Sequence, residues 1–356
     1  MSSPQAPADA PDSADEADSA PLITVVVPLH NGAQYIDQTL TSIQRQSLSA
    51  AEVIVVDDGS TDEGPAIART HSVEAVVIQQ ERLGVAVARN RGLALARGRW
   101  VAFLDQDDIW HPDHLRRTLA WLAANPGERI AFVKEIPFTV SEEADNLRGM
   151  DQLAGGWAHL VVAQDRAYQE LVERADVEGS ASVQRSDHRA MLRGPISTTT
   201  SFIADPLLLR LAGGFAPHAL AMDDYWLLVN AARLHPIAQL DQPTVFYRVH
   251  VAATSRTTRL GLPFLSSAVA LRFGGGLIGR DEALEGALTG NLHLHLLREL
   301  ITSPEYRNGA YRRVVDELAR LMWPPYGRSR ERRKALIAMR APWIRRILRS
   351  LRGSTR

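Results

Sequence analysis

Residues 98–110, GRWVAFLDQDDIW, are the stretch that decides the fold. An apolar run over residues 100–104 stops at three carboxylates in four positions, Asp105, Asp107 and Asp108. A run this short and apolar predicts a buried strand of a parallel sheet. The acidic end of such a strand lies at the carboxyl edge of the sheet, where open α/β folds bind ligands.

The acidic cluster needs a positive partner, because neighbouring carboxylates raise one another's pKa. A divalent ion is the simplest partner. Hard oxygen ligands with no cysteine or histidine alongside favour Mg²⁺ or Mn²⁺ over zinc. One alternative uses no metal: Asp107 and Asp108 cap the helix that is expected to begin near Pro112.

Three further strands are predicted before the acidic one. Short apolar or β-branched runs over residues 22–27, 53–56 and 73–78 indicate central strands. Between the first two, apolar residues from Ile36 to Ile43 repeat at helical spacing, so this segment forms a right-handed βαβ unit. Four strands with helices between them predict half of a doubly wound sheet.

Polar clusters follow these strands at the expected ligand edge. LHNG (29–32) follows the first strand and DDGSTD (57–62) follows the second. Helix capping explains the serine and threonine of the second cluster, but it leaves Asp57 and Asp58 at the strand tip unexplained. No G-x-G-x-x-G follows the first strand, which argues against a dinucleotide cofactor, and no P-loop motif is present.

Composition and charge bound the class of protein. The chain has 356 residues, a formal net charge of −1 and no cysteine, which excludes disulfides, Cys-ligated zinc and a cysteine nucleophile. Residues 1–20 hold five acids and no base, whereas residues 328–356 hold eleven Lys or Arg and one acid. We therefore expect a disordered acidic leader over residues 1–20 rather than a signal peptide. No apolar stretch reaches the roughly 18 residues of a membrane span.

Four segments in order resemble the nucleotide-sugar half of an inverting family-two glycosyltransferase with the GT-A fold. They are VVVPLHNG (25–32), VVDDGSTD (55–62), GVAVARNRGLALARG (84–98) and VAFLDQDDIWHPD (101–113). The resemblance covers about residues 22–125, and the order and spacing of the four segments are more specific than any one of them. It implies an α/β fold of the GT-A type, a Rossmann-like and mostly parallel sheet with helices on both faces.

The resemblance also implies roles for single residues. Arg89 falls near the base or the phosphates, although a plain surface charge is the alternative. Asp105 falls at the ribose, and Asp107 becomes the principal ligand of Mn²⁺ or Mg²⁺, with Asp105 and His250 beside it. His30 stands where the family often has tyrosine. The residues implied to hold the nucleoside base are Pro28, His30, Asn31, Asp57 and Asp58.

The second half of the chain is expected to complete the domain on the acceptor side. Strands are predicted at residues 130–136 and 244–249, and a helix that begins near Asp223 follows the turn Gly-Gly-Phe. In the family this arrangement carries the catalytic base, usually the second acid of a Glu-Asp pair. The resemblance therefore implies Asp224 as the base, with Asp223 in place of the glutamate, whereas helix capping is the alternative for both. One base without an enzyme nucleophile implies inversion.

The segment YRVHVAATS (247–255) resembles the closing motif of the family, in which the histidine lies over the diphosphate or the metal. Arg248 is then a counter-charge to the leaving group, and a structural role is the alternative for His250. Residues 259–327 predict a helical extension. Residues 328–356 predict a basic amphipathic helix, which either lies on an anionic membrane surface or packs on the catalytic domain.

These observations predict a catalytic domain over residues 21–258, with a nucleotide-sugar half at 21–125 and an acceptor half at 126–258. The expected activity is sugar transfer from a nucleotide diphosphate to the hydroxyl of a glycan, a cell-surface polysaccharide or a secondary metabolite. UDP is the first expectation for the nucleotide, with GDP or dTDP as alternatives. The expected location is the cytoplasm, with the tail at the inner face of the membrane.

Two other functions stay open. A sugar nucleotidyltransferase shares the sheet and the divalent ion, but usually carries a Gly-rich loop with arginine directly after the first strand. A non-enzymatic nucleotide-sugar-binding protein on a degenerate transferase fold is expected to lose Asp107 or the acids at 223 and 224, and this chain keeps them.

Overall fold

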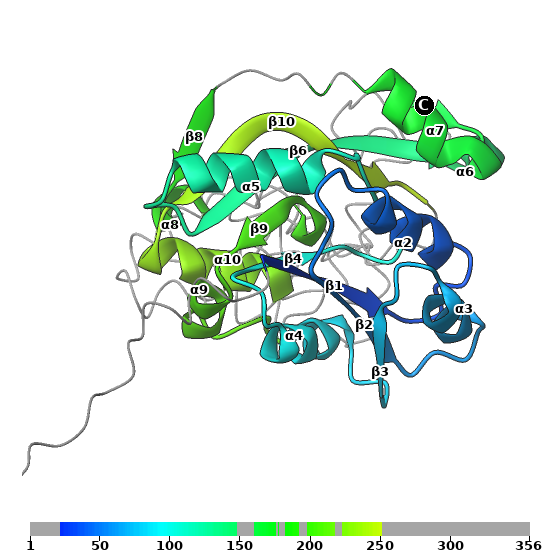
Figure 1. The fold of residues 1–356 in the computed structure, drawn as a ribbon, viewed down its shortest axis with the longest axis horizontal. Helices are drawn as coiled ribbons and strands as arrows, with labels where there is room; N and C mark the ends of the chain where they lie inside the picture. Colours follow the sequence, from blue (N-terminus) through cyan, green and yellow to red (C-terminus); the bar gives the residue numbers. More distant parts are fainter. Residues whose placement is uncertain are drawn as a thin grey trace, which may run out of the picture.

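The structure, a computed structural model, describes residues 22–147, 160–175, 177, 182–191, 198–217 and 223–250. These residues form three layers, a central sheet between two layers of helices (Figure 1). Within them, no helix has the length and apolar character that crossing a bilayer requires. The expected helical extension and basic tail lie outside the described residues.

The first half of the sheet is parallel. Strand β1 (Ile23–Leu29) lies between β2 (Glu52–Asp58) and β4 (Trp100–Phe103), and β3 (Val76–Gln80) pairs with the outer side of β2. The residues of β1 are all buried, as expected for a strand covered on both faces. The carboxyl ends of these strands therefore point to one edge, as the sequence predicts.

The second half of the sheet is mixed. Strand β9 (Phe202–Ala204) runs antiparallel between β4 and β6 (Ile130–Val140), and β10 (Ile237–Arg248) runs parallel to β6. The mostly parallel α/β fold is confirmed, with antiparallel pairings made by β9 and two short strands. At the edges, β5 (Ile109–Trp110) and β8 (Val183–Ser186) pair antiparallel with β10, and β7 (Leu160–Val162) pairs parallel with β6.

Two hydrophobic layers cover the sheet. On one face, Val25 and Val27 of β1 pack with residues of α2 (Ile36–Gln44), α3 (Gly64–Thr70) and α5 (His114–Ala124). On the other face, Val26 belongs to a cluster that includes residues of three longer helices, and Figure 1 shows the two sets of helices on opposite sides. The alternation along β1 follows from the two-residue period of a strand. The second set is α4 (Val85–Leu95), α9 (Pro206–Leu211) and α10 (Asp223–Leu234).

Shorter elements complete the described part. The remaining described helices are α6 (Ser141–Leu147), η2 (Gln164–Arg166), α7 (Ala167–Arg174), α8 (His188–Met191) and η3 (Thr199–Ser201). A smaller hydrophobic cluster joins β5, β6, β7 and β10 to α7 through Phe138, Leu171 and Phe246.

Helix α4 approaches β1 closely at Gly92. A Cβ atom at this position would lie 2.2 Å from Cγ1 of Val26, which is far inside van der Waals contact. Only glycine therefore allows this helix to pack as near to the sheet as it does. The close packing positions the next polar side chain of the same helix face, Arg89, over the ends of the strands.

Several predicted boundaries were wrong. The third strand begins at Val76 rather than at residue 73, and the strand predicted at 130–136 extends to Val140. The strand predicted at 244–249 is the second part of β10, whose pairing is interrupted around Pro243, a residue with no N–H to donate. Helix α5 has Asp113 as its N-cap residue, so Asp107 and Asp108 do not cap it.

Candidate active site

Nearly all of the sequence-predicted site residues lie at the carboxyl edge of β1, β2 and β4 and are linked to one another by hydrogen bonds and ion pairs. Two elements of the second half, α10 and the end of β10, complete this edge. The residues are His30 and Asn31 after β1, Asp57 and Asp58 in β2, Arg89 in α4, Asp105 and Asp107 after β4, Asp223 and Asp224 in α10, and Arg248 and His250 at β10.

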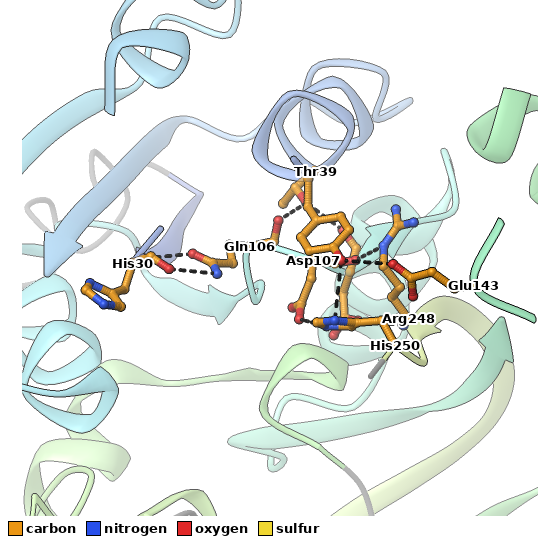
Figure 2. Close-up of polar contacts among 9 residues, drawn as sticks. His30, Thr39, Gln106, Asp107, Glu143, Arg248 and His250 are labelled. Carbon is orange, nitrogen blue, oxygen red and sulfur yellow. Dashed lines mark hydrogen bonds and ion pairs between the residues drawn. The ribbon is translucent and has the colours of Figure 1, made fainter. Parts of the chain in front are cut away.

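The acidic loop, residues 105–108, is tied to the first loop and to helix α2. Gln106 Oε1 accepts from the backbone N–H of His30 (2.7 Å), and Gln106 Nε2 donates to the carbonyl of His30 (3.1 Å), as Figure 2 shows. Thr39 Oγ1 lies 2.7 Å from the carbonyl of Gln106 and 2.9 Å from that of Asp108. These bonds fix the backbone that presents the carboxylates.

Arg248 holds the same loop from β10. Its Nε donates to the carbonyl of Asp107 (2.6 Å), its backbone N–H donates to Asp108 Oδ1 (2.8 Å), and its Nη2 donates to Gln38 (2.7 Å). Burial lowers the pKa of the Arg248 guanidinium, and burial raises the pKa of Asp108 well above its ordinary value. Arg248 therefore fixes the acidic loop, and a counter-charge role toward a leaving group stays a prediction.

Arg89 is buried rather than a plain surface charge. Its Nη2 donates to Asp105 Oδ1 (2.6 Å), and its Nη1 donates to Asp223 Oδ2 (2.8 Å). Burial alone would lower the pKa of Arg89, but the carboxylates of Asp105 and Asp223 outweigh burial and raise it above its ordinary value. Burial raises the pKa of Asp105, although Arg89 opposes that shift. The acidic cluster therefore finds part of its charge balance in the chain itself, a source that the sequence did not identify.

Asp224 follows Asp223 in the first turn of α10. Thr199 Oγ1 donates to its Oδ2 (3.1 Å), and the backbone N–H of Tyr225 donates to its Oδ1 (2.7 Å). Burial, with the negative charge of Asp223 next, raises the pKa of Asp224 to about 6. A carboxylate of this kind exchanges a proton close to neutral pH, which is what a general base requires.

The two acids of β2 differ in their contacts. The carboxylate of Asp58 accepts from Gln80 Nε2 and from the backbone N–H groups of Leu83 and Gly84, each at 2.8 Å. Asp57 accepts from the backbone N–H of Ser60, but its Oδ2 is buried and has no hydrogen-bond partner among the described residues. Asp58 thus fixes the loop before α4, whereas one carboxylate oxygen of Asp57 is left without a partner among the described residues.

The first loop is ordered by backbone and side-chain contacts. His30 Nδ1 donates to the carbonyl of Asp58 (2.9 Å). Asn31 adopts a positive φ of 49°, which asparagine tolerates, and its Oδ1 accepts from the backbone N–H of Thr61 (2.8 Å). Pro28 is buried within β1. This places the loop between the ends of β1 and β2, where a flat ligand is expected.

A second group of polar residues surrounds His250. Its Nε2 lies 2.9 Å from Asp107 Oδ2, and its Nδ1 lies 3.3 Å from the hydroxyl of Tyr35. That hydroxyl also donates to Glu143 Oε1 (3.3 Å). Burial first, and the charge of Glu143 next, raise the pKa of Tyr35 to about 12. Figure 2 shows Asp107, Glu143, Arg248 and His250 gathered at one end of the acidic loop, away from His30.

A divalent ion at this end of the acidic loop stays a prediction. Among the described residues, no group of three or more His, Cys, Asp or Glu side chains is arranged to hold a metal ion. Magnesium sites of nucleotide-dependent enzymes usually take only one or two carboxylates and are completed by phosphates and water. The carboxylates of Asp105 and Asp107 are donors of the type that Mg²⁺ and Mn²⁺ prefer.

Sequence reasoning missed Tyr35, Thr39, Gln106, Glu143 and Thr199. Gln106 lies inside the acidic motif but was given no role there, and the other four belong to no motif that the sequence singled out. The partners of all five lie far away in the chain. The burial of Arg89 did have a signal. Ala86, Arg89 and Leu93 follow helical spacing, so a charge occupies the apolar side of α4.

The fold and the carboxylates at the strand ends define an α/β domain of the GT-A class. Residues 24–137 match the Glycosyl transferase family 2 domain, from β1 into β6. The four motifs of the sequence all lie within this segment, which is similar to glycosyltransferase family 2.

Curated relatives match over the same part. TuaG of Bacillus subtilis (strain 168), named for teichuronic acid biosynthesis, is 42% identical over 106 residues, 29% of this chain and 42% of that protein. The amylovoran biosynthesis glycosyltransferase AmsB of Erwinia amylovora is 38% identical over 112 residues, 30% of this chain and 37% of that protein. The succinoglycan biosynthesis protein ExoO of Rhizobium meliloti (strain 1021) is 40% identical over 105 residues, which are 29% of this chain and 30% of that protein. The chain thus spans less than half the length of each.

Solved structures resemble the chain over more of its length. S. aureus TarS 1–349 in complex with UDP has a TM-score of 0.55 at 18% identity and covers 89% of this chain and 86% of its own. The same protein in complex with UDP-GlcNAc has a TM-score of 0.57 at 16% identity, with 85% and 81% covered. At these identities the likeness concerns the fold.

Proposed function

We propose that this chain is a metal-dependent, inverting glycosyltransferase that moves a sugar from a nucleotide diphosphate to an acceptor hydroxyl. One observation carries the proposal: Arg89 joins Asp105 of the acidic loop to Asp223, the neighbour of the candidate base Asp224. The buried side chain of Arg89 thereby contacts both the donor side and the acceptor side of the candidate site. The match to glycosyltransferase family 2 supports the reaction class.

The donor half reads the nucleotide in this proposal. The unpartnered Oδ2 of Asp57 is suited to accept a hydrogen bond from a ring N–H of a nucleobase, next to His30 and Asn31. An unmet acceptor in a buried position is unfavourable until a ligand donates to it, so it contributes to selectivity. UDP is our first choice of nucleotide, since TarS was solved with UDP and with UDP-GlcNAc. GDP and dTDP are the alternatives.

The acceptor half supplies the base. Asp224 takes the proton of the acceptor hydroxyl as the hydroxyl oxygen bonds to the anomeric carbon. The bond between the anomeric carbon and the diphosphate oxygen breaks, and its electron pair leaves with the nucleoside diphosphate. Attack opposite the leaving group inverts the anomeric configuration. The raised pKa of Asp224, about 6, suits a base that works near neutral pH.

The leaving group needs charge neutralisation. A bound Mn²⁺ or Mg²⁺ supplies it as a Lewis acid. Asp107 is the main residue that would hold the ion, with Asp105 and His250 beside it. Arg248 and Thr39 keep the loop of these acids rigid, so the ligands are preorganised before the donor binds.

The acceptor class that we propose is a growing cell-surface polysaccharide. The names of TuaG, AmsB and ExoO all refer to polysaccharide biosynthesis, although each match is confined to the donor half. We further propose that the protein works in the cytoplasm, at the inner face of the membrane, where the basic residues 328–356 can meet anionic lipid.

The test is nucleotide release from UDP-, GDP- and dTDP-sugars by the full-length chain, with Mn²⁺ and after EDTA. Metal-dependent release of one nucleotide supports the proposal. Exchange of pyrophosphate into a nucleoside triphosphate would instead favour a nucleotidyltransferase. Tight nucleotide binding without release from any donor and acceptor pair would favour a non-enzymatic binding protein.

A further inference from the structure

The short helix η3 brings a hydroxyl group to the candidate base. Thr199 Oγ1 donates to Asp224 Oδ2 at 3.1 Å, and the backbone N–H of Tyr225 donates to Asp224 Oδ1 at 2.7 Å. The two donors belong to η3 and to α10, and they bind different oxygens of one carboxylate. Together they fix the direction in which the carboxylate points.

Helix η3 is itself held on both sides of Thr199. Glu135 Oε1 accepts from the backbone N–H of Thr198 (2.8 Å) and from its hydroxyl (2.6 Å). Trp110 Nε1 donates to the carbonyl of Thr200 (2.9 Å). The side chain of Thr199 is buried between these two contacts, so its hydroxyl has a fixed place next to α10.

We propose that Thr199 is a positioning residue, whose hydroxyl holds the carboxylate of Asp224 in one orientation and stabilises its ionised form. This inference rests on the proposed function, in which Asp224 is the base. A hydrogen bond that an ionised carboxylate accepts is charge-assisted, and it is stronger than the bond that the neutral acid would accept. Thr199 therefore favours the form of Asp224 that can take a proton.

The neighbouring acid, Asp223, is held in a different way. Its Oδ2 accepts from Arg89 Nη1 at 2.8 Å, and its side chain is only 6% exposed. Asp224 is half-buried and its two described donors are a hydroxyl and a backbone N–H, both neutral. An acceptor hydroxyl can therefore approach Asp224 more readily than Asp223, which supports Asp224 as the base of the pair.

The pKa of Asp224 gives the proposal a measurable sign. Burial first, and the charge of Asp223 next, raise this pKa to about 6, whereas the hydrogen bond from Thr199 acts in the lowering direction. Removal of the Thr199 hydroxyl should therefore raise the pKa further. Loss of one charge-assisted hydrogen bond corresponds to an upward shift of about one pH unit.

Other charged and titratable groups also surround Asp224, and they stay the same in every variant of Thr199. Asp223 raises its pKa and Arg89 lowers it. The groups on the surrounding elements are Arg89 of α4, Asp105 of the acidic loop, Glu135 of β6, His188 of α8, Arg210 of α9, and Asp223 and Tyr225 of α10. A difference between the wild type and a Thr199 variant therefore reports the hydroxyl.

Thr200 offers a matched control in the same turn of η3. Its side chain is also buried, but its Oγ1 has no hydrogen-bond partner among the residues that the structure describes. Valine has nearly the shape of threonine, with a methyl group in place of the hydroxyl. Thr199→Val thus removes the bond to Asp224, Thr200→Val removes a hydroxyl without such a bond, and Thr199→Ser keeps the hydroxyl.

The first measurement is a ¹³C titration of the Asp224 carboxyl group in the metal-free full chain, with its signal assigned by its loss in Asp224→Asn. We expect a midpoint near pH 6 in the wild type, Thr200→Val and Thr199→Ser, and a midpoint about one pH unit higher in Thr199→Val. Thr199→Ala also lacks the hydroxyl and should match Thr199→Val, which provides a second test if the valine variant does not fold. Equal midpoints in the Thr199→Val and Thr200→Val variants would overturn the proposal.

The second measurement is the pH dependence of kcat, with donor affinity measured in parallel. In Thr199→Val the fall of kcat at low pH should begin about one pH unit higher than in the wild type, with donor affinity unchanged, whereas Thr200→Val should match the wild type in both. An unshifted profile in Thr199→Val would contradict the positioning role. A wild type that releases no nucleotide from any donor would count against the proposed function, while the carboxyl titration, which needs neither donor nor acceptor, would still test the hydrogen bond.

Discussion

Arg89 and Asp223 form a buried ion pair, with Nη1 2.8 Å from Oδ2, across 134 residues of sequence. The other arm of the same guanidinium binds Asp105 at 2.6 Å. The arginine thereby connects the acidic loop after β4 with the first turn of α10. Arg89 therefore pairs with an acid of each of the two motifs that define the candidate reaction, the acidic loop and the acids of α10. Substitutions of Arg89 should affect both motifs.

Arg89→Gln is expected to leave Asp223 as an unpaired buried acid and Asp105 as an unpaired, partly exposed one. Removing one partner of a buried pair usually lowers the free energy of unfolding by about 3–5 kcal/mol, and we expect the lower end because Asp105 keeps 26% of its side chain exposed. Arg89→Lys should recover only part of this, since one ammonium cannot reproduce the two-armed geometry. Urea unfolding measures the effect.

Arg91 is the control for this prediction, because it lies on the exposed side of the same helix. Arg91→Gln should change stability by no more than about 0.5 kcal/mol. Equal stabilities of the Arg89→Gln and Arg91→Gln variants would show that the buried contact has no role in holding the motifs together.

The turnover rate should fall at low pH, because Asp224 becomes protonated there. Its pKa is raised to about 6 by burial and by Asp223, and only the ionised form can accept a proton. We predict that kcat rises with pH through about 6 and then levels. The slope should be absent from the residual activity of Asp224→Asn. A wild-type profile that is flat between pH 4 and 8 would contradict this role.

The same shift predicts a stability effect of defined sign. The folded-state pKa of Asp224 lies above the value of about 3.9 expected in the unfolded chain, so the folded state binds more protons between the two. The contribution of Asp224 to stability is thus fully present below about pH 4 and is lost as pH rises through about 6. Asp224→Asn should be more stable than the wild type above pH 6, and this gain should vanish in acid, as thermal unfolding at several pH values would report.

Substitutions of Asp57 and Asp58 should have different effects, on nucleotide binding for Asp57 and on stability for Asp58. Asp58→Asn keeps one acceptor oxygen and turns the other into an NH₂ donor that faces an N–H group, so at least one of the three bonds is lost and we expect a stability loss of about 1–3 kcal/mol. Asp57→Asn should fold normally and lose the thermal stabilisation that UDP gives to the wild type. A thermal-shift titration with UDP tests both, and the account fails here if Asp57→Asn keeps the full UDP shift.

The edge of the sheet was predictable because its signals are local. Short apolar runs that end in carboxylates specify buried parallel strands, and these strands place Asp57 and Asp105 at one edge whatever follows in the chain. The match of residues 24–137 to one family agrees with this, since every motif behind the prediction lies in that segment.

The partners of the carboxylates were not predictable, because they depend on how distant segments pack. Insertion of β9 between β4 and β6 brings Thr199 to Asp224, and no sequence period reports that pairing. Tyr35 and Glu143 likewise meet only because α2 and α6 converge on the end of β10. Side chains of this kind carry no spacing rule, so geometry alone identifies them.

Gly92 should tolerate no side chain. A Cβ atom 2.2 Å from Val26 Cγ1 forces α4 away from β1, and overpacking of this type costs about 1–3 kcal/mol. Gly92→Ala should therefore lower the urea midpoint and also weaken activity, because α4 carries Arg89. Gly127→Ala is the control, since a Cβ there meets no atom within 4 Å among the described residues. Equal midpoints for the two variants would contradict the close packing.

The central claim is that the acids at this edge bind a nucleotide sugar and that Asp224 activates the acceptor. The most direct measurement is nucleotide release by the wild type and by Asp224→Asn with Mn²⁺, with binding of the same donor measured in parallel. We predict unchanged donor binding and a rate loss of about 10²–10⁴-fold in Asp224→Asn. Full turnover by Asp224→Asn, or loss of donor binding in step with turnover, would contradict the account.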